Sequence, residues 1–480
     1  MDTPSGPQVL EKHERYLTAH KPNDLYWGIG LEEEFYLELE HPLRVSTDHI
    51  IQNQRPERYS VNYLNSFKEP ILKEALSKYL IQNKTPLHKI PILVNCHSFA
   101  STDTEGQPRT TYTKQPRPNP RFSGTSVHEL LTENSQWYKD NYKKIFCYDG
   151  NTFEIMTQKF YKTTAELACE ELRLSKQRFL EEIKPTINKI PIYAQHGSIR
   201  YMSGNHGLAT YMTNYNQINL CNNGTLHVSL TMPTLLNADA SAPADEDHFN
   251  HRHLQAARLI QWIEPLLLAI YGEPDFLSSV DNRFSASSQR GAISRYIGIA
   301  NYDTNEAPQG KLLTTNQIPI WYEMYHTTSA YRQLEEIGFD IQFRKFPNHG
   351  LELRIFDRLP DSCILPLVRF LVLLLDRSMA LRNNSLLVKA PQTYAAWNAW
   401  LIDILRNGKK ARADAALLSL YEELIGCRLP ASGSPEEIYK VATAHLEKTY
   451  ATTGECAVKM LDQIREPAAA LQKKSILCCH

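Results

Sequence analysis

The sequence predicts an α+β protein in which helices cover one face of a sheet. Short segments with strand character are separated by helices and long connections, an order typical of that class. No such segment is followed by a glycine-rich phosphate loop, so neither a Rossmann domain nor a P-loop is indicated. The predicted strands are residues 28–40, 92–97, 152–157, 225–232, 295–301 and 350–357.

The chain organisation follows from length and local composition. At 480 residues the chain exceeds one simple domain, so two lobes and one large domain with additions are both open. Residues 1–25 are polar and predict an N-terminal arm, and residues 26–385 form the main domain. Residues 96–150 are a loop insertion, rich in Thr, Pro, Gly and Arg from 98 to 126. Residues 386–480 predict a helical C-terminal region.

Composition narrows the class of partner. Lys plus Arg number 52 against 53 Asp plus Glu, which favours neither nucleic acid nor an acidic membrane surface. Nine cysteines without a C-x-x-C pair argue against a zinc cluster and a disulfide framework. The longest apolar run, residues 363–375, contains Pro366 and Arg369 and is too short to span a bilayer, and no basic-then-apolar leader follows Met1. We therefore expect a cytoplasmic protein with a small-molecule partner or a local patch on another protein.

The first predicted strand is unusually acidic. Residues 28–40 read GIGLEEEFYLELE, and strand side chains alternate between two faces. The apolar face comprises Ile29, Leu31, Phe35, Leu37 and Leu39, the acidic face comprises Glu32, Glu34, Glu38 and Glu40, and Glu33 breaks the pattern. An acidic face in water is the ordinary interpretation. The alternative is that Glu32 and Glu34, two residues apart, bind a divalent cation through their oxygens.

Three later strands also pair an apolar face with a polar one. In the strand 225–232, apolar residues alternate with His227, Ser229 and Thr231. In the strand 152–157, Glu154 lies between two apolar residues. In the strand 350–357, apolar residues alternate with Glu352 and Arg354. If these strands share one sheet, their polar groups converge on one face. Such a face has ligands for about two or three Mg²⁺ ions, with an arginine beside them where phosphate oxygens would arrive.

Arginines are also concentrated between these strands. The segment SVDNRFSASSQRGAISRYIGIANY contains Arg283, Arg290 and Arg295 on a glycine- and serine-rich background. Fixed guanidinium groups suit a polyphosphate or a substrate carboxylate. For each arginine taken singly, a solvated charge remains the alternative.

In this order, these motifs resemble the glutamate-cysteine ligase and glutamine synthetase superfamily of ATP-dependent carboxylate-amine ligases. The resemblance covers residues 28–380, and its most specific parts are Glu-x-Glu-Phe at 32–35 and Glu-x-Arg-x-Phe-Asp at 352–357. It implies an antiparallel sheet saddle that holds ATP with Mg²⁺ or Mn²⁺. It also implies a reaction in which a substrate carboxylate is phosphorylated to an acyl phosphate and then attacked by an amine.

The resemblance assigns roles to particular residues. The implied metal ligands are Glu32, Glu34, Glu154, His227 and Glu352. Arg290, Arg295, Arg354 and Ser229 are expected to bind the nucleotide, and Arg354 and Arg295 to act in catalysis. The amine must lose a proton, and the sequence leaves Glu33 and a tyrosine open as acceptors.

Several interpretations remain open at this level. The expected substrates are glutamate or a similar amino acid and an amine, with no nucleic acid or membrane partner. A second interpretation is an amidoligase that modifies a protein or peptide side chain, which the 98–126 loop and the helical tail would dock. A third is a nucleotide-binding regulatory module with a decayed ligase site. His206, in SGNHG, contacts substrate or is a solvated turn histidine, and His248, His251 and His253 predict an exposed helix start rather than a metal site.

Overall fold

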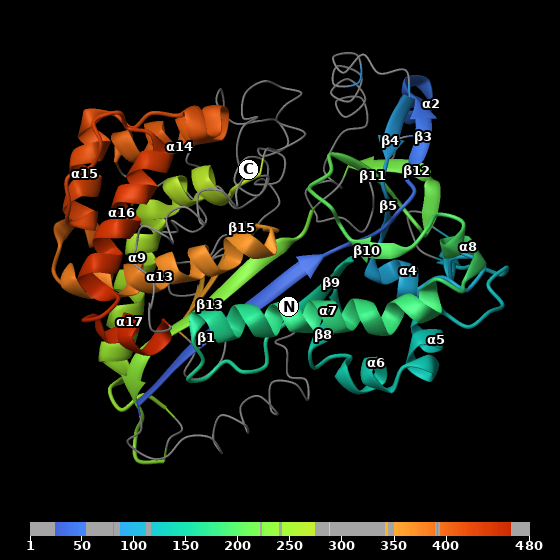
Figure 1. Cartoon of the computed structure of the whole chain (residues 1–480), viewed down its shortest axis with the longest axis horizontal. Helices are drawn as coiled ribbons and strands as arrows, with labels where there is room; N and C mark the ends of the chain where they lie inside the picture. Colours follow the sequence, from blue (N-terminus) through green and yellow to red (C-terminus); the bar gives the residue numbers. More distant parts are fainter. Residues whose placement is uncertain are drawn as a thin grey trace. The chain divides into compact units, whose positions relative to one another are not determined.

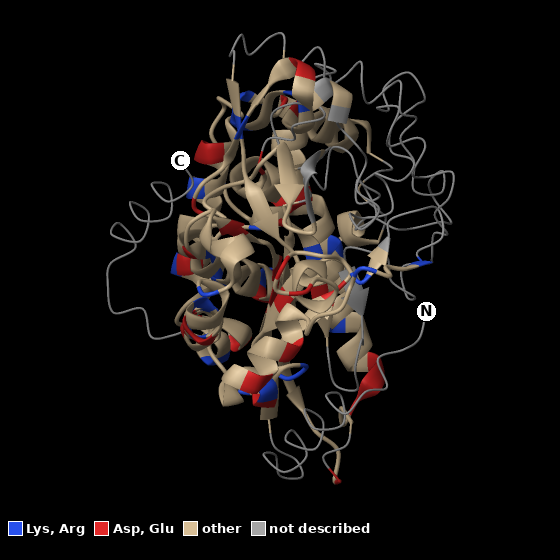
Figure 2. Ribbon diagram, turned by 90° about the vertical axis from the view of Figure 1, so that its right-hand side faces the viewer, with Lys and Arg blue, Asp and Glu red and all other residues tan. Residues whose placement is uncertain are grey.

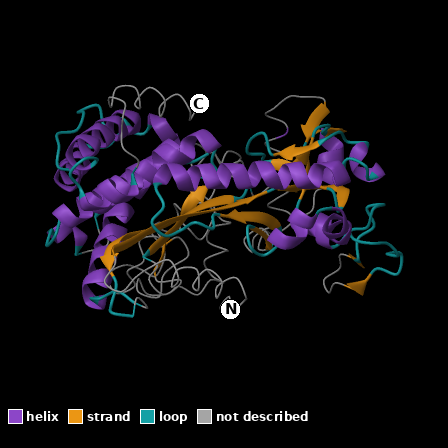
Figure 3. Ribbon diagram, turned by 60° about the horizontal axis from the view of Figure 1, so that its bottom comes forward, coloured by secondary structure: helices purple, strands orange, loops and turns teal. Residues whose placement is uncertain are grey.

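The structure is a computed structural model of the whole chain. It describes residues 25–53, 80, 87–111, 117–220, 223–239, 242–273, 288, 341–343, 350–388, 391 and 394–461. Helices and strands are both prominent in it (Figure 3). The predicted fold class is confirmed at the level of an α+β protein with antiparallel sheets and a helical C-terminal region.

The chain divides into two compact units. Unit 1 comprises Met1–Glu32, Thr157–Glu171 and Leu226–His480, and unit 2 comprises Glu33–Met156 and Leu172–Thr225. The division passes through strand β1 (Leu25–Phe35) and helix α7 (Ala165–Ile187), so each of these elements contributes to both units. Acidic and basic residues are interspersed along the described ribbon (Figure 2).

Unit 1 is built on the neighbouring strands β14, β15, β13 and β1, in that order. Their bounds beyond β1 are Ile341–Phe343 for β14, Leu351–Asp357 for β15 and Thr225–Leu235 for β13. The apolar residues that alternate along these strands are at most 2% exposed: Ile29, Leu31, Leu226, Val228, Leu230, Met232, Leu351, Leu353 and Ile355. The alternation predicted from the sequence is therefore present, and it places the polar residues of each strand on the opposite face.

Two long helices supply the apolar layer of unit 1. Helices α9 (Glu246–Tyr271) and α13 (Asp361–Ala380) pack on each other, and α9 also packs on β15 (Figure 1). The Asp245 side chain accepts the backbone N–H of His248 and so caps α9, which explains why this helix begins at Glu246. The inward faces of both helices are fully buried, as a core helix requires.

The C-terminal helices belong to the same unit. They pack on α9 and α13, directly or through one another (Figure 1). Their bounds are Ala395–Asn407 for α14, Ala415–Ile425 for α15, Pro435–Tyr450 for α16 and Glu455–Met460 for α17, with short 3-10 turns at Ser385–Leu387 and Gly408–Lys410. The predicted helical region is thus part of the compact unit that contains the β13–β15 strands.

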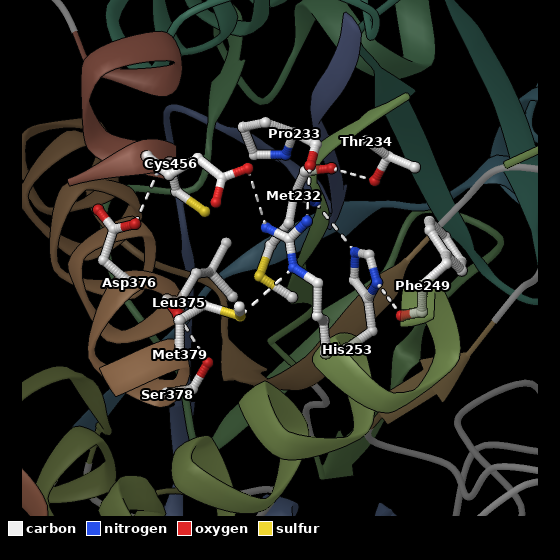
Figure 4. A network of polar contacts seen from close by, with 12 residues as sticks. Met232, Pro233, Thr234, Phe249, His253, Leu375, Asp376, Ser378, Met379 and Cys456 are labelled. Atoms are coloured by element: carbon white, nitrogen blue, oxygen red, sulfur yellow. Dashed lines mark hydrogen bonds and ion pairs between the residues drawn. The ribbon is translucent and has the colours of Figure 1, made fainter. Parts of the chain in front are cut away.

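A buried polar network connects β13, α9, α13 and α17 (Figure 4). His253 is fully buried, its Nδ1–H donates to the Phe249 carbonyl at 2.8 Å, and its Nε2 accepts the Met232 backbone N–H at 3.0 Å. Burial, aided by the nearby charge of Arg252, lowers the pKa of His253 to about 3. His248 and His251 are exposed as expected, but the expectation of an exposed His253 was wrong because its helical face points into this network.

In the same network, Asp376 holds the last described helix. Its two carboxylate oxygens accept the backbone N–H groups of Cys456 and Ala457, at 2.8 and 2.9 Å (Figure 4). These are donors that the first turn of α17 leaves unsatisfied. A side chain of α13 therefore ties α17 to the unit 1 core.

Unit 2 contains most of the short elements. Its sheet has the order β10, β2, β5, β11, β12, in which all pairs are antiparallel except β5 with β11. These strands span Ile199–Tyr201, Leu37–Leu39, Ile92–Val94, Leu208–Tyr211 and Asn214–Leu220. The end of β1 adjoins β9 (Thr152–Met156) and β8 (Phe146–Asp149). Two-stranded ladders join β3 (Leu43–Ser46) with β4 (Leu87–Ile90) and β6 (Thr110–Thr111) with β7 (Arg117–Pro118).

The predicted insertion at 96–150 is folded at both ends. It contains α4 (Cys96–Ala100), α5 (Val127–Asn134) and α6 (Gln136–Asn141), while α2 (Thr47–Asn53) and α8 (Pro191–Ala194) complete the short helices of unit 2. Ser126 and Glu129 form a reciprocal capping box at the start of α5. Arg109 binds the same Glu129 carboxylate at 2.7 Å, which fastens the irregular part of the insertion to α5.

The acidic segment 28–40 is two strands, not one. β1 ends at Phe35, β2 begins at Leu37, and the two strands belong to different sheets. Tyr36 lies between them, fully buried, with its hydroxyl donating to Asn151 Oδ1 at 2.8 Å. The apolar-polar alternation continues across the change of sheet, so the sequence pattern did not reveal it.

Some expectations fall outside the described residues. They include the N-terminal arm, the strand at 295–301, the arginines at 283, 290 and 295, and the end of the C-terminal region after 461. Among the helices that the structure describes, none has the length and hydrophobicity needed to cross a bilayer.

Candidate functional site

Three of the predicted ligand residues meet in unit 1. Glu32, His227 and Glu352 come from the consecutive strands β1, β13 and β15, and one ligand atom of each lies within 4.8 Å of the others. His227 Nδ1 is 3.4 Å from Glu32 Oε2 and 4.0 Å from Glu352 Oε1. The imidazole nitrogen therefore faces both carboxylates. Within the described ranges, this is the group of His, Cys, Asp and Glu side chains with metal-site spacing.

The cluster is shielded from solvent on one side. The side chains of His227 and Glu352 are each 3% exposed, whereas that of Glu32 is 19% exposed. Two carboxylates in a partly buried place repel each other, and the ionised forms are costly unless a cation or proton lies close by. The arrangement favours positive charge between these three groups.

The donor set fits a divalent cation. Carboxylate oxygens are the ligands that Mg²⁺ prefers, at about 2.0 to 2.1 Å in octahedral geometry. The imidazole nitrogen shifts the preference toward Mn²⁺ and other transition ions. Three protein ligands on one face leave the other coordination positions to water or phosphate oxygens. The residues are compatible with the Mg²⁺ or Mn²⁺ that we expected.

Arg354 and Ser229 lie on the same strands as the cluster. Arg354 follows Glu352 by two residues on β15, and its Nη1 is 3.9 Å from Glu352 Oε2. Its side chain is 22% exposed, so a permanently charged group lies at the rim of the cluster. Ser229 follows His227 by two residues on β13 and is partly exposed on that face. Both positions agree with an anionic ligand that approaches the cluster.

Phe160 is a residue of this face that sequence reasoning missed. A Cβ added to Gly28 would lie 2.1 Å from the Phe160 ring, and one added to Gly30 would lie 2.8 Å from it. Both glycines share the face of Glu32 on β1, because they precede it by four and two residues. The absence of side chains at 28 and 30 leaves room for the ring next to the cluster strand. Two glycines spaced by two residues were the available signal.

The other predicted ligands are placed in unit 2. Glu34 lies near the end of β1, and Glu154 on β9 has Oε2 3.5 Å from Cys147 Sγ on the paired strand. The compact cluster does not include them, and their assignment as metal ligands stays a prediction. Arg290 and Arg295 lie outside the described residues, so their assignment also stays a prediction.

Glu33 is not the accessible proton acceptor that we considered. Its side chain is fully buried in unit 2, and its Oε2 lies 2.7 Å from Lys176 Nζ of α7. Glu33 points to the helix side of β1, which is why it interrupts the acidic face in the sequence. Its charge is used in a buried ion pair.

The sequence is similar to a protein of a giant virus. It is 35% identical over 458 residues to Uncharacterized protein R704 of Acanthamoeba polyphaga mimivirus, which covers 93% of this chain and 79% of the viral protein. The chain belongs to the family of this viral protein. Because the R704 match covers nearly the whole chain, it is not limited to one of the two units. No protein-family model matches the sequence.

Proposed function

We propose that this member of the R704 family is an ATP- and Mg²⁺- or Mn²⁺-dependent carboxylate-amine ligase. The observation that carries the proposal is the Glu32, His227 and Glu352 cluster with Arg354 at its rim. A metal ion that bridges the phosphates and a guanidinium beside them can stabilise phosphoryl transfer without a glycine-rich loop. The order of the motifs along the sequence, which resembles the glutamate-cysteine ligase and glutamine synthetase superfamily, supports the same proposal.

In this proposal the chain's residues act on phosphate charge. Glu32, His227 and Glu352 would hold the divalent ion, which neutralises the charge of the β- and γ-phosphates when bound. Arg354, with Arg295 as a predicted partner, would orient and stabilise the γ-phosphoryl group as its bond to ADP breaks. A substrate carboxylate oxygen forms the new bond to phosphorus and needs no activating base. The amine then displaces phosphate from the acyl phosphate and gives up one proton.

The experiment is a matrix of amino acids and amines, scored by ADP release and by amide formation. Turnover should require Mg²⁺ or Mn²⁺, and Glu352→Gln should lower it by roughly 100-fold or more. The matched control is Glu40→Gln, an exposed glutamate of the acidic segment that lies outside the cluster. Retained turnover in Glu352→Gln, or an equal loss in Glu40→Gln, would contradict the assignment.

Ion binding is measured separately. Manganese electron paramagnetic resonance should show one bound population that Glu352→Gln weakens and Glu40→Gln leaves unchanged. A modifier of protein side chains would remain silent with free amino acids and release ADP once its target is added. A decayed module would bind ATP with Mg²⁺ and turn over with no pair of substrates.

A further inference from the structure

A second polar group in unit 2 has the geometry of an oriented base. His206 lies in the loop between β10 and β11, and its Nε2 is 2.8 Å from Glu38 Oε2 on β2. Arg200, directly opposite Glu38 in the β10–β2 ladder, donates to Glu38 Oε1 from Nε at 2.9 Å, and its Nη2 lies 2.6 Å from the same oxygen in an ion pair. The group is thus assembled from two paired strands and the loop that follows β10.

Glu38 is held in its ionised form at neutral pH in this arrangement. Its side chain is 3% exposed, and burial alone would raise its pKa. Hydrogen bonds from His206, Arg200 and Ser203 outweigh that effect and lower the pKa of Glu38 to about 2. An ionised carboxylate can only accept, so the His206 nitrogen that faces it is the protonated one. In neutral His206 the lone pair is therefore on Nδ1.

The backbone of His206 is fixed as firmly as its ring. Asn223 is 6% exposed, its Oδ1 accepts the His206 N–H at 2.7 Å, and its Nδ2 donates to the His206 carbonyl at 3.2 Å. A solvated turn histidine needs neither of these constraints. Among the described residues, Nδ1 takes part in no hydrogen bond or ion pair, and the His206 side chain is 22% exposed. Within the described residues, Nδ1 is thus the ring atom of His206 that is left for a ligand.

The group of His206, Glu38 and Arg200 in unit 2 does not suit a cation. Arg200 already occupies the second oxygen of Glu38, and no third His, Cys, Asp or Glu with metal-site spacing joins it among the described residues. The Arg200 side chain is 48% exposed, and its contacts with Glu38 involve Nε and Nη2, which leaves Nη1 for an anionic group of a ligand. A base beside an exposed guanidinium matches a polar substrate that carries both an acidic N–H or O–H and a carboxylate or phosphate.

We propose that His206 is an acid-base residue of a second chemical site, in unit 2, with Glu38 and Asn223 as its positioning residues. The substrate N–H or O–H gives its proton to Nδ1, while the Nε2 proton stays in the hydrogen bond to Glu38. The carboxylate balances the imidazolium charge until the proton leaves to solvent or to a leaving group. The inference rests on unit 2 geometry alone and does not depend on the proposed ligase activity.

The test is acylation of the full chain by diethyl pyrocarbonate, which reacts with neutral imidazole nitrogens, followed by peptide-resolved mass spectrometry. His251 is an exposed internal reference, and His253, with both nitrogens engaged, is an unreactive one. At pH 8, His206 should react at least as fast as His251 in spite of its lower exposure. Glu38→Gln should slow His206 roughly tenfold, the size of one lost charge-assisted hydrogen bond, and leave His251 unchanged.

The outcomes are distinguishable from those of the ligase test. His206 that reacts as slowly as His253 overturns the proposal, because Nδ1 is then unavailable. His206 that reacts equally fast in the parent and in a folded Glu38→Gln variant also overturns it, because the carboxylate then does not activate the ring. The comparison of His206 with His251 and His253 within the parent sample needs no variant to fold. Failure of ADP release leaves these readouts intact.

Discussion

The buried pair of Glu33 and Lys176 gives the sharpest prediction for stability. Lys176 Nζ is 2.7 Å from Glu33 Oε2, and the two side chains are 5% and 0% exposed. The Tyr201 ring lies 5.3 Å from the ammonium, and the Tyr201 hydroxyl donates to the Lys176 carbonyl. Lys176→Met removes the positive charge and keeps an unbranched side chain in the same place. The Glu33 carboxylate would then have lost the ammonium that balances its charge.

The magnitude follows from the burial of both groups. Breaking a buried ion pair by removal of one partner costs about 3 to 5 kcal/mol, because a charge stays in a medium of low dielectric constant. Neutralising both partners is often close to neutral, since the desolvation cost disappears with the charges. Lys176→Met should therefore lower the free energy of unfolding by about 3 to 5 kcal/mol, and the double variant Glu33→Gln/Lys176→Met should recover at least about half of that loss.

Urea unfolding followed by circular dichroism measures the loss, and hydrogen exchange in the peptides of residues 172–187 shows whether it is local to unit 2. Lys184→Met is the matched control, because Lys184 is exposed on the same helix and its replacement should change stability by at most about 0.5 kcal/mol. A Lys176→Met variant whose free energy of unfolding is within about 1 kcal/mol of the parent's would refute the argument, because such a loss is too small for a buried carboxylate that has lost its ion-pair partner.

Three further predictions concern other parts of the chain. The folded pKa of Glu38, about 2, is below its ordinary 4.5, so the stability it contributes is present above pH 4.5 and lost as pH falls toward 2. That gap corresponds to roughly 3 kcal/mol, and thermal melts from pH 2 to 6 should show a smaller acid loss in Glu38→Gln than in the parent. Arg354→Lys keeps the charge but not the planar fork, so ADP release should fall by roughly tenfold or more while Mg²⁺-ATP affinity, measured by calorimetry, falls less; equal losses would argue against a transition-state role. Gly224 has φ +87°, and a Cβ there would lie 2.0 Å from the Glu34 carbonyl oxygen, so Gly224→Ala should lower the melting temperature and cost more than about 1 kcal/mol, unlike Gly204→Ala, whose Cβ would meet open space.

The parts of the fold that the sequence predicted are those in which local pattern and tertiary burial agree. The alternation in β13 and β15 identified their polar faces correctly, and so it predicted that His227 and Glu352 lie on the same side of the strands as Glu32. The histidines at 248, 251 and 253 indicated the start of α9, and the capping Asp245 sets the first residue of that helix. Period-two patterns report burial, which is why they identified the strand faces.

The features that the sequence did not predict depend on partners far away in the chain. The sequence around Glu33 does not indicate that its partner is Lys176, and the sequence around Glu38 does not indicate Arg200 or His206. Each of these partners is more than 140 residues further along the chain. The change of sheet at Tyr36 was hidden because a strand alternates in the same way whichever neighbour it pairs with. The sequence shows which side chains carry a charge, but which of them pair with one another becomes clear only from the fold.

The run Glu32, Glu33 and Glu34 has a consequence for how this strand is specified. Glu32 and Glu34 lie on one face of β1 and Glu33 on the other, toward Lys176 of helix α7, yet all three side chains are chemically the same. A slip of one residue would therefore still present a carboxylate at the middle position, and the glutamates themselves cannot reject the wrong register. The discrimination must come from the neighbours, because a slip would turn Leu31 and Phe35 out of the core and drive side chains into the space that Gly28 and Gly30 leave for Phe160. The register of this strand is therefore specified by the glycines and the flanking apolar residues, whereas the acidic run supplies the ligand chemistry without fixing the register.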